Sequence, residues 1–145
     1  DHLLLFFTGR SRFASEIAVE QIKNTPQKTR ELKRMLEMVD HAVQILRNGA
    51  LNDFGRLLDE TWQLKRNLSS KISNELIDEI YSAGKEAGAL GGKILGAGGG
   101  GFILFFVPLE KKENVKTKLK NLLHIPFNFE SGGSQIIYNA IQNAS

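Results

Sequence analysis

The chain has 145 residues, of which 41% are hydrophobic and 24% are charged, a composition typical of one globular domain rather than a disordered segment. Its 19 Lys and Arg residues exceed its 16 Asp and Glu residues by three, an excess too small and too scattered to favour nucleic-acid binding. No apolar stretch approaches the roughly 20 residues of a membrane-spanning helix, and with no cysteine the chain has neither disulfides nor thiolate metal sites.

The first residues predict a strand followed by a helix. Residues 3–7 form a short apolar run that ends at Thr8-Gly9, which favours a buried strand and a turn. This run is too short for a signal peptide, so together with the absence of cysteine it leads us to expect a cytoplasmic protein. A helix is predicted over 12–24, with Ala14, Ile17, Ala18 and Ile22 on its apolar side. Because the chain starts without Met at the edge of a strand, we expect it to be part of a longer protein.

Three further helices are predicted over 27–47, 52–67 and 73–87. In the first, apolar residues recur at steps of four and three and form one stripe: Leu32, Leu36, Val39, Val43 and Leu46. Gly49 is suited to the left-handed position that ends this helix. The second helix has an apolar side that includes Trp62, which we interpret as a core residue. The third is capped by Ser73 or Asn74.

The last third of the sequence predicts strands and one short helix. Residues 91–101 form a glycine-rich loop and 102–107 a core strand. A surface helix is expected over 110–123, with Val115, Leu119 and Leu122 facing inward. Alternating apolar residues over 125–129 predict a half-buried strand, and a turn over 131–134 leads to a final strand over 135–138. The whole pattern predicts an α+β domain, with about four mainly antiparallel strands and four to five helices.

The loop over 96–101 carries the strongest chemical signal, because five of its six residues are glycine: Gly96, Ala97, Gly98, Gly99, Gly100 and Gly101. Ordering such a segment costs much conformational entropy, so the glycines require a compensating reason. One interpretation is close approach of backbone N–H groups to an anionic ligand, and the other is a tight turn between closely packed backbones. The loop is no Walker A loop, since no Gly-Lys-Ser/Thr follows. It is no dinucleotide fingerprint either, since the predicted order is helix, loop, strand.

Residues 93–102 (KILGAGGGGF) resemble the third conserved motif of the GHMP kinases, a superfamily that includes galactokinase, homoserine kinase and mevalonate kinase. Leu95 stands where many members have Ser or Thr, and Phe102 where many have a small residue. Residues 5–14 (LFFTGRSRFA) are similar to a segment of the heptose-phosphate kinase and fucokinase branches, and residues 62–68 (WQLKRNL), followed by Ile72-Ser73, resemble the heptose-kinase branch. The resemblance implies a ferredoxin-like C-terminal domain, whose glycine motif lines the active-site cleft.

The resemblance also implies how the work of a sugar kinase is divided between two domains. An N-terminal domain absent from this chain would hold ATP, Mg²⁺ and a catalytic Asp, so no catalytic residue and no metal ligand is assigned here. The substrate would be a sugar or sugar phosphate of the D-glycero-D-manno-heptose 7-phosphate type. The substrate- or phosphate-binding candidates are Thr8, Gly9, Arg12, Lys65 and Lys93, beside the glycine motif. Arg12 is a candidate because a guanidinium grips phosphate with paired hydrogen bonds.

Two other functions fit the same sequence. A binding or regulatory module would keep the fold without the chemistry, and we expect the chain alone to be inactive in either case. A nucleic-acid-binding domain is a weaker interpretation, prompted by the positive net charge. Each candidate residue also has a structural alternative, since Lys65, Lys93 and Arg12 suit a solvated helix or strand surface equally well.

Overall fold

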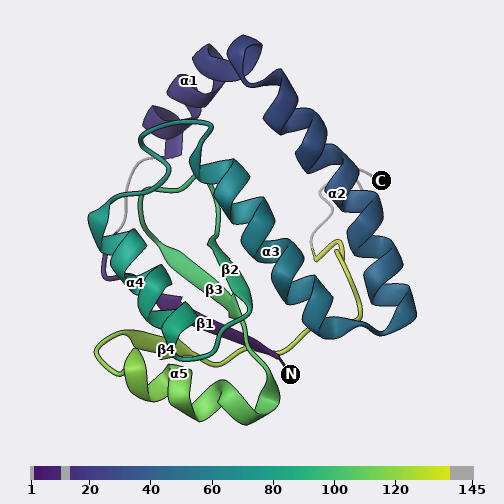
Figure 1. Ribbon diagram of the computed structural model, residues 1–145, viewed down its shortest axis with the longest axis vertical. Coiled ribbons are helices and arrows are strands. Elements are labelled where there is room, and N and C mark those ends of the chain that lie inside the picture. Colours follow the sequence, from purple (N-terminus) through teal and green to yellow (C-terminus); the bar gives the residue numbers. More distant parts are fainter. Residues whose placement is uncertain (1, 11–13, 138–145) are drawn as a thin grey trace, which may run out of the picture.

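A computed structural model describes residues 2–10 and 14–137, and its centre is a four-stranded antiparallel sheet (Figure 1). The strands are β1 (Leu3–Phe7), β2 (Gly91–Ile94), β3 (Phe102–Phe106) and β4 (Leu123–Ile125). Their order in the sheet is β2-β3-β1-β4, so β1 and β3 are central. The register places Leu5 opposite Leu104, and Lys93 also opposite Leu104 from the other side. The predicted α+β class with a mainly antiparallel sheet is confirmed.

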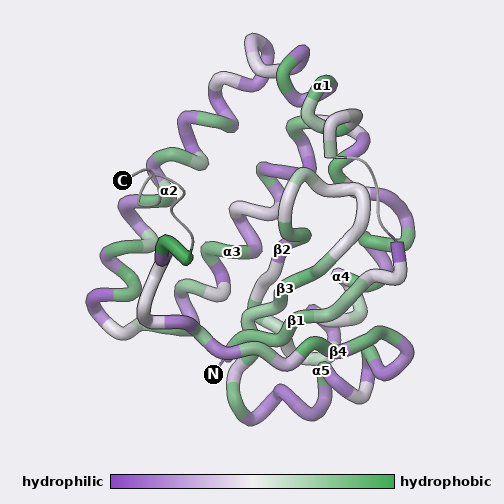
Figure 2. Tube along the Cα trace, turned by 180° about the vertical axis from the view of Figure 1, so that it is seen from behind, coloured by the Kyte–Doolittle hydropathy of each residue, from purple (hydrophilic) through white to green (hydrophobic). Residues whose placement is uncertain are grey.

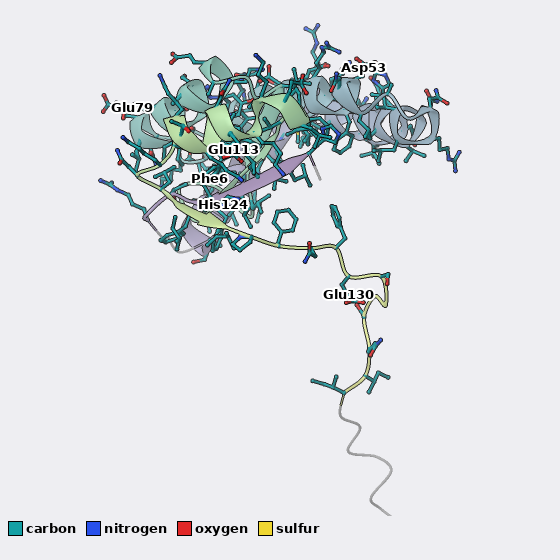
Figure 3. All side chains as sticks on the ribbon, turned by 90° about the horizontal axis from the view of Figure 1, so that it is seen from below. Phe6, Asp53, Glu79, Glu113, His124 and Glu130 are labelled. Carbon is teal, nitrogen blue, oxygen red and sulfur yellow. The ribbon has the colours of Figure 1, made fainter. Side chains whose placement is uncertain are left out.

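The main core lies on one face of this sheet. Alternate residues of the two central strands are buried there, with Phe6, Ile103 and Phe105 at most 1% exposed. Helices α4 (Glu75–Glu86) and α5 (Lys112–Lys118) lie over this face, as the view from below shows (Figure 3). On the opposite face Phe106 is 3% exposed, because Phe54 and Gly55 pack on it, but the other residues of the two central strands are only partly buried there and Phe102 is 41% exposed. The sheet therefore has one face packed under helices and one face that is more open.

Helices α1 (Ala14–Asn24), α2 (Thr29–Asn48) and α3 (Leu51–Arg66) form an arch beside the sheet (Figure 1). Gly49 is left-handed at the end of α2, as predicted, and α3 runs along β2. Trp62 of α3 is fully buried between α3 and α4, which confirms it as a core residue. None of the helices in the described residues is long and apolar enough to cross a membrane.

The predicted apolar stripe of α2 does not face the core. Its five residues are 37–71% exposed, whereas Met38 and Ile45 are buried against α3: Leu32, Leu36, Val39, Val43 and Leu46 form the exposed stripe. In α1, Ile17 is buried as expected, whereas Ile22, also expected on the apolar side, is 71% exposed. Both helices were predicted, but the packing side of α2 was wrong, because that helix carries two neighbouring apolar stripes.

Two predicted strands differ from the structure. Residues 91–94, expected to belong to the loop, form β2, and of the strand predicted over 125–129 only Ile125 lies in a strand, at the end of β4. Residues 126–137 contain no strand, so none is found in the described part of 135–138. Figure 2, seen from behind, shows β1 and β3 as mostly hydrophobic segments and β2 as a paler one, and Figure 3 shows the segment that carries Glu130 leading away from the body of the domain. In the described residues the number of strands agrees with the prediction, but β2 was not predicted and the last predicted strand was not found.

Candidate functional site

The glycine motif connects two neighbouring strands of the sheet. It follows β2 and precedes β3, and Leu95 N–H donates to the carbonyl of Phe102 at 2.8 Å, which extends the strand pairing into the loop. The expected order of helix, loop and strand was therefore wrong. The observed order is strand, loop, strand, because residues 91–94, which begin with two glycines, form β2. A loop that spans a hairpin is held at both ends by the sheet, so its backbone has a fixed position.

One end of the loop is bound to the end of β1. Gly101 N–H donates to the carbonyl of Arg10 at 2.6 Å, and Thr8 N–H donates to the carbonyl of Gly101 at 2.8 Å. The Thr8 hydroxyl donates to the same Gly101 oxygen at 2.9 Å, and Thr8 is only 3% exposed. Thr8 is thus a structural anchor of the loop, since its hydroxyl is already engaged and turned away from solvent. Gly9, left-handed at φ 78° and exposed, makes the turn after the strand.

The middle of the loop is bound to the segment before α4. Gly99 N–H donates to the carbonyl of Ile72 at 2.8 Å, and the Asn74 side-chain amide donates to the carbonyl of Gly99 at 3.2 Å. The Asn74 oxygen meanwhile accepts from Ile77 N–H at the start of α4, as a helix cap does. Asn74 was predicted only as a cap, so its bond to the loop is a function that the sequence did not reveal.

Close packing within the domain explains part of the glycine content. A Cβ on Gly98 would lie 2.7 Å from the carbonyl oxygen of Ile72, and a Cβ on Gly100 would lie 2.7 Å from that of Arg10. At these two positions the interpretation as closely packed backbones holds, rather than approach to a ligand. Gly96 is different, since its φ is 74° and a Cβ there would meet nothing within 4 Å. The loop is therefore anchored from Gly98 onward and open at Gly96, where the residue is exposed.

Two lysines stand at the open part of the loop. Lys65, at the end of α3, donates from Nζ to the carbonyl of Gly96 at 2.6 Å. Burial lowers the pKa of Lys65, and the positive charge of Lys93 on β2 lowers it further. Both side chains are half-buried. The structure thus brings together Lys65, Lys93 and the glycine motif, which the sequence analysis named as candidates.

The nearby acidic groups are occupied by other partners. Arg66 pairs with Asp78, which also accepts from the hydroxyl of Ser73. Lys85 pairs with Asp59 at 2.9 Å, and Asp59 accepts from the Tyr81 hydroxyl as well. Within residues 2–10 and 14–137, no group of three or more His, Asp or Glu side chains is placed to hold a metal ion. Asp59 and Asp78 are therefore engaged in contacts within the domain.

The candidate residues from the sequence divide into those that the structure describes and Arg12, which it does not. Thr8, Gly9, Lys65 and Lys93 lie at or next to the glycine motif. Arg12 lies outside the described residues, so its proposed contact with phosphate stays a prediction. The residues that anchor the loop, Arg10 through its carbonyl and Asn74 through its side chain, were not among the candidates. Their backbone and amide contacts carry no signature in a single sequence.

The family model for the C-terminal region of GHMP kinases matches residues 42–125, which include α3, α4, the glycine motif and β4. This chain belongs to the GHMP kinase C-terminal family. The family match includes both lysines and all of the anchored loop. It excludes β1 and α1, which precede residue 42.

Two curated relatives extend the comparison beyond the family model. The chain is 33% identical over 120 residues to D-glycero-alpha-D-manno-heptose 7-phosphate kinase of Campylobacter jejuni, which covers 81% of this chain and 35% of that protein. It is 28% identical over 123 residues to the bifunctional fucokinase/GDP-fucose pyrophosphorylase of Arabidopsis thaliana, covering 81% of this chain and 12% of that protein. The chain therefore spans about a third or less of the length of these relatives.

Solved structures show the same fold. L. major mevalonate kinase in complex with R-mevalonate superposes with a TM-score of 0.71 at 23% identity, covering 82% of this chain and 37% of the other. Streptococcus pneumoniae phosphomevalonate kinase also gives a TM-score of 0.71, at 21% identity, over 86% of this chain and 38% of the other. At such low identity the likeness defines the architecture and not the substrate.

Proposed function

We propose that this chain is the C-terminal, substrate-side domain of an ATP-dependent sugar kinase. In the reaction, the γ-phosphoryl group of ATP passes to a hydroxyl of a heptose phosphate of the D-glycero-D-manno-heptose 7-phosphate type. Membership of the GHMP kinase C-terminal family and 33% identity to the heptose 7-phosphate kinase support this proposal. The chain itself forms one domain, and a separate N-terminal domain of the same protein is its partner.

The observation that carries the proposal is the rigid glycine motif with two lysines at its open end. Phosphoryl transfer is catalysed by positioning the reacting groups and by neutralising phosphate charge. The anchored loop supplies a fixed backbone wall, and Lys65 and Lys93 supply two positive charges beside Gly96. These contributions bind and orient substrate, but they include no base for the attacking hydroxyl.

The remaining chemistry is assigned to the N-terminal domain. We place the metal ligands, the nucleotide phosphate loop and the catalytic Asp in that domain, and within residues 2–10 and 14–137 no group of three or more His, Asp or Glu side chains is placed to hold a metal ion. Mg²⁺, when bound, neutralises the phosphates of ATP. The chain alone is therefore inactive, because it supplies groups that bind the substrate but not the groups that bind and activate ATP.

A substrate screen on the full-length protein tests the proposal. ADP release is measured with ATP and, in turn, D-glycero-D-manno-heptose 7-phosphate, fucose and galactose, and ³¹P NMR identifies the product. We expect turnover with the heptose phosphate and a new phosphate ester resonance. Binding of the heptose phosphate without ADP release would instead identify a non-catalytic binding module. Turnover with galactose or fucose alone would overturn the heptose assignment.

A further inference from the structure

Lys65 and Lys93 form a pair of positive charges that the fold assembles from distant parts of the sequence. Lys65 ends α3, whereas Lys93 lies on β2, and Gly55 and Asp59 of α3 pack directly on Gly91 of that strand. Two neighbouring ammonium groups repel each other, and an anion bound between them removes that repulsion. A fold that fixes this pair on a helix and a strand therefore provides a site for an anion.

The other basic side chains around this point already have carboxylate partners. Arg66 pairs with Asp78, and Lys85 pairs with Asp59. In contrast, Lys65 donates to the carbonyl of Gly96, and neither Lys65 nor Lys93 forms an ion pair with a carboxylate of residues 2–10 or 14–137. One carbonyl bond leaves two of the three N–H groups of the Lys65 ammonium available.

The backbone next to the two lysines adds further donors. Within the described part of the chain, the N–H groups of Gly96 and Ala97 donate to no acceptor, and neither do those of Gly98 and Gly100, whereas those of Gly99 and Gly101 bind backbone carbonyls. A Cβ on Gly96 would meet nothing within 4 Å, so the space in front of this backbone is open. Ammonium groups and free backbone N–H groups together are the donors that phosphate recruits in proteins.

We infer that Lys65, Lys93 and the Gly96–Ala97 backbone receive the phosphate group that the sugar substrate already carries, the group that is not transferred. This inference rests on the proposed function and makes it more specific, because it assigns a sugar phosphate rather than a free sugar as substrate. Two lysines match the two negative charges of a phosphate monoester, whereas a neutral sugar would leave both uncompensated. The γ-phosphate of ATP has the same chemistry, so the experiment separates the two sources.

Three variants of the full-length protein test the inference: Lys93→Met, which removes the charge at similar length; Lys93→Arg, which keeps it; and Lys33→Met, an exposed lysine of α2, as the control. We expect Lys93→Met to raise KM for the heptose phosphate about ten- to hundred-fold, the value of one hydrogen bond to a charged group. KM for ATP and for the unphosphorylated heptose stays unchanged, and Lys93→Arg retains most of the affinity. A rise in KM for ATP instead would assign the pair to the nucleotide, and equal KM changes for both sugars would overturn the inference.

Direct binding of inorganic phosphate separates this inference from the kinase proposal. Phosphate is titrated into the protein while the backbone amide NMR signals of Gly96 and Ala97 are followed. We expect saturable shifts that Lys93→Met weakens and Lys33→Met preserves. If these shifts occur in a protein that has no kinase activity, the anion site is supported and the proposed kinase function is refuted. Absence of shifts in a protein that is an active kinase would refute the anion site alone.

Discussion

Replacing Gly100 by Ala tests whether the glycine motif is held by packing within the domain. The added Cβ would lie 2.7 Å from the carbonyl oxygen of Arg10, an atom that accepts the Gly101 hydrogen bond. Relieving an overpacked contact costs about 1–3 kcal/mol, and weakening that hydrogen bond adds about 1 kcal/mol. The lower entropy of the unfolded chain offsets less than about 1 kcal/mol. We therefore expect Gly100→Ala to reduce the free energy of unfolding by about 2–3 kcal/mol.

Gly96→Ala is the matched control in the same loop. Gly96 is left-handed at φ 74° but has open space in front of it, so Ala there adds backbone strain of about 1 kcal/mol without a clash. Equilibrium unfolding in urea is followed by the fluorescence of Trp62, the single tryptophan of this chain, which is fully buried. If Gly100→Ala unfolds at the same urea concentration as Gly96→Ala, the loop is not held by the Arg10 backbone and the reasoning fails.

Three further predictions address the helix cap, a half-buried ion pair and the activity of the domain. Asn74→Ala removes both the cap of α4 and the bond to Gly99, so we expect unfolding to become easier by about 1–2 kcal/mol in the same urea assay. Burial raises the pKa of Asp59, but hydrogen bonds from Tyr81 and Lys85 outweigh it and the net pKa lies below 3.8. The ionised Asp59 therefore stabilises the fold at pH values above 3.8, and this contribution is lost as the pH falls through its lowered pKa. We expect Asp59→Asn to remove this pH dependence of the free energy of unfolding, measured by urea titrations at pH 2.5–6. The 145-residue chain alone releases no ADP from ATP and heptose phosphate, whereas the full-length protein does.

Each of these predictions has an outcome that contradicts it. Unchanged stability of Asn74→Ala would show that another donor caps α4. An equal loss of stability at acidic pH in Asp59→Asn and in the parent would assign that loss to other carboxylates. ADP release by the chain alone, at a rate that scales with its concentration, would mean that the catalytic groups lie within these residues.

The helices were predictable because their signals are local. The recurrence of apolar residues at steps of three and four defines α2, Gly49 ends it, and Asn74 caps α4 as predicted. The continuous apolar runs likewise identified β1 and β3. β2 was missed since Gly91 and Gly92 have little preference for a strand, and it forms because β3 pairs with it and α3 packs closely on the bare backbone of Gly91.

The candidate site was predicted as a set of residues but not as an arrangement. The sequence indicated the glycine motif, Lys65 and Lys93, yet equally allowed the two lysines to lie on solvated surfaces. It also allowed the glycines to serve a ligand or a tight turn, and the structure shows that Gly98 and Gly100 serve internal packing. The difference between Gly96 and Gly100 depends on where the Arg10 carbonyl lies, about 90 positions earlier in the chain.

The sequence by itself determined which segments are helical, where the glycine motif lies and to which family that motif belongs, because backbone preference and apolar period are properties of neighbouring residues. Only the tertiary structure decided which stripe of α2 packs on α3, which glycines are required by contact with another segment, and that Lys65 and Lys93 lie beside one open stretch of backbone. These features arise when distant segments compete for the same buried surface, and that competition is resolved only when the whole domain has packed.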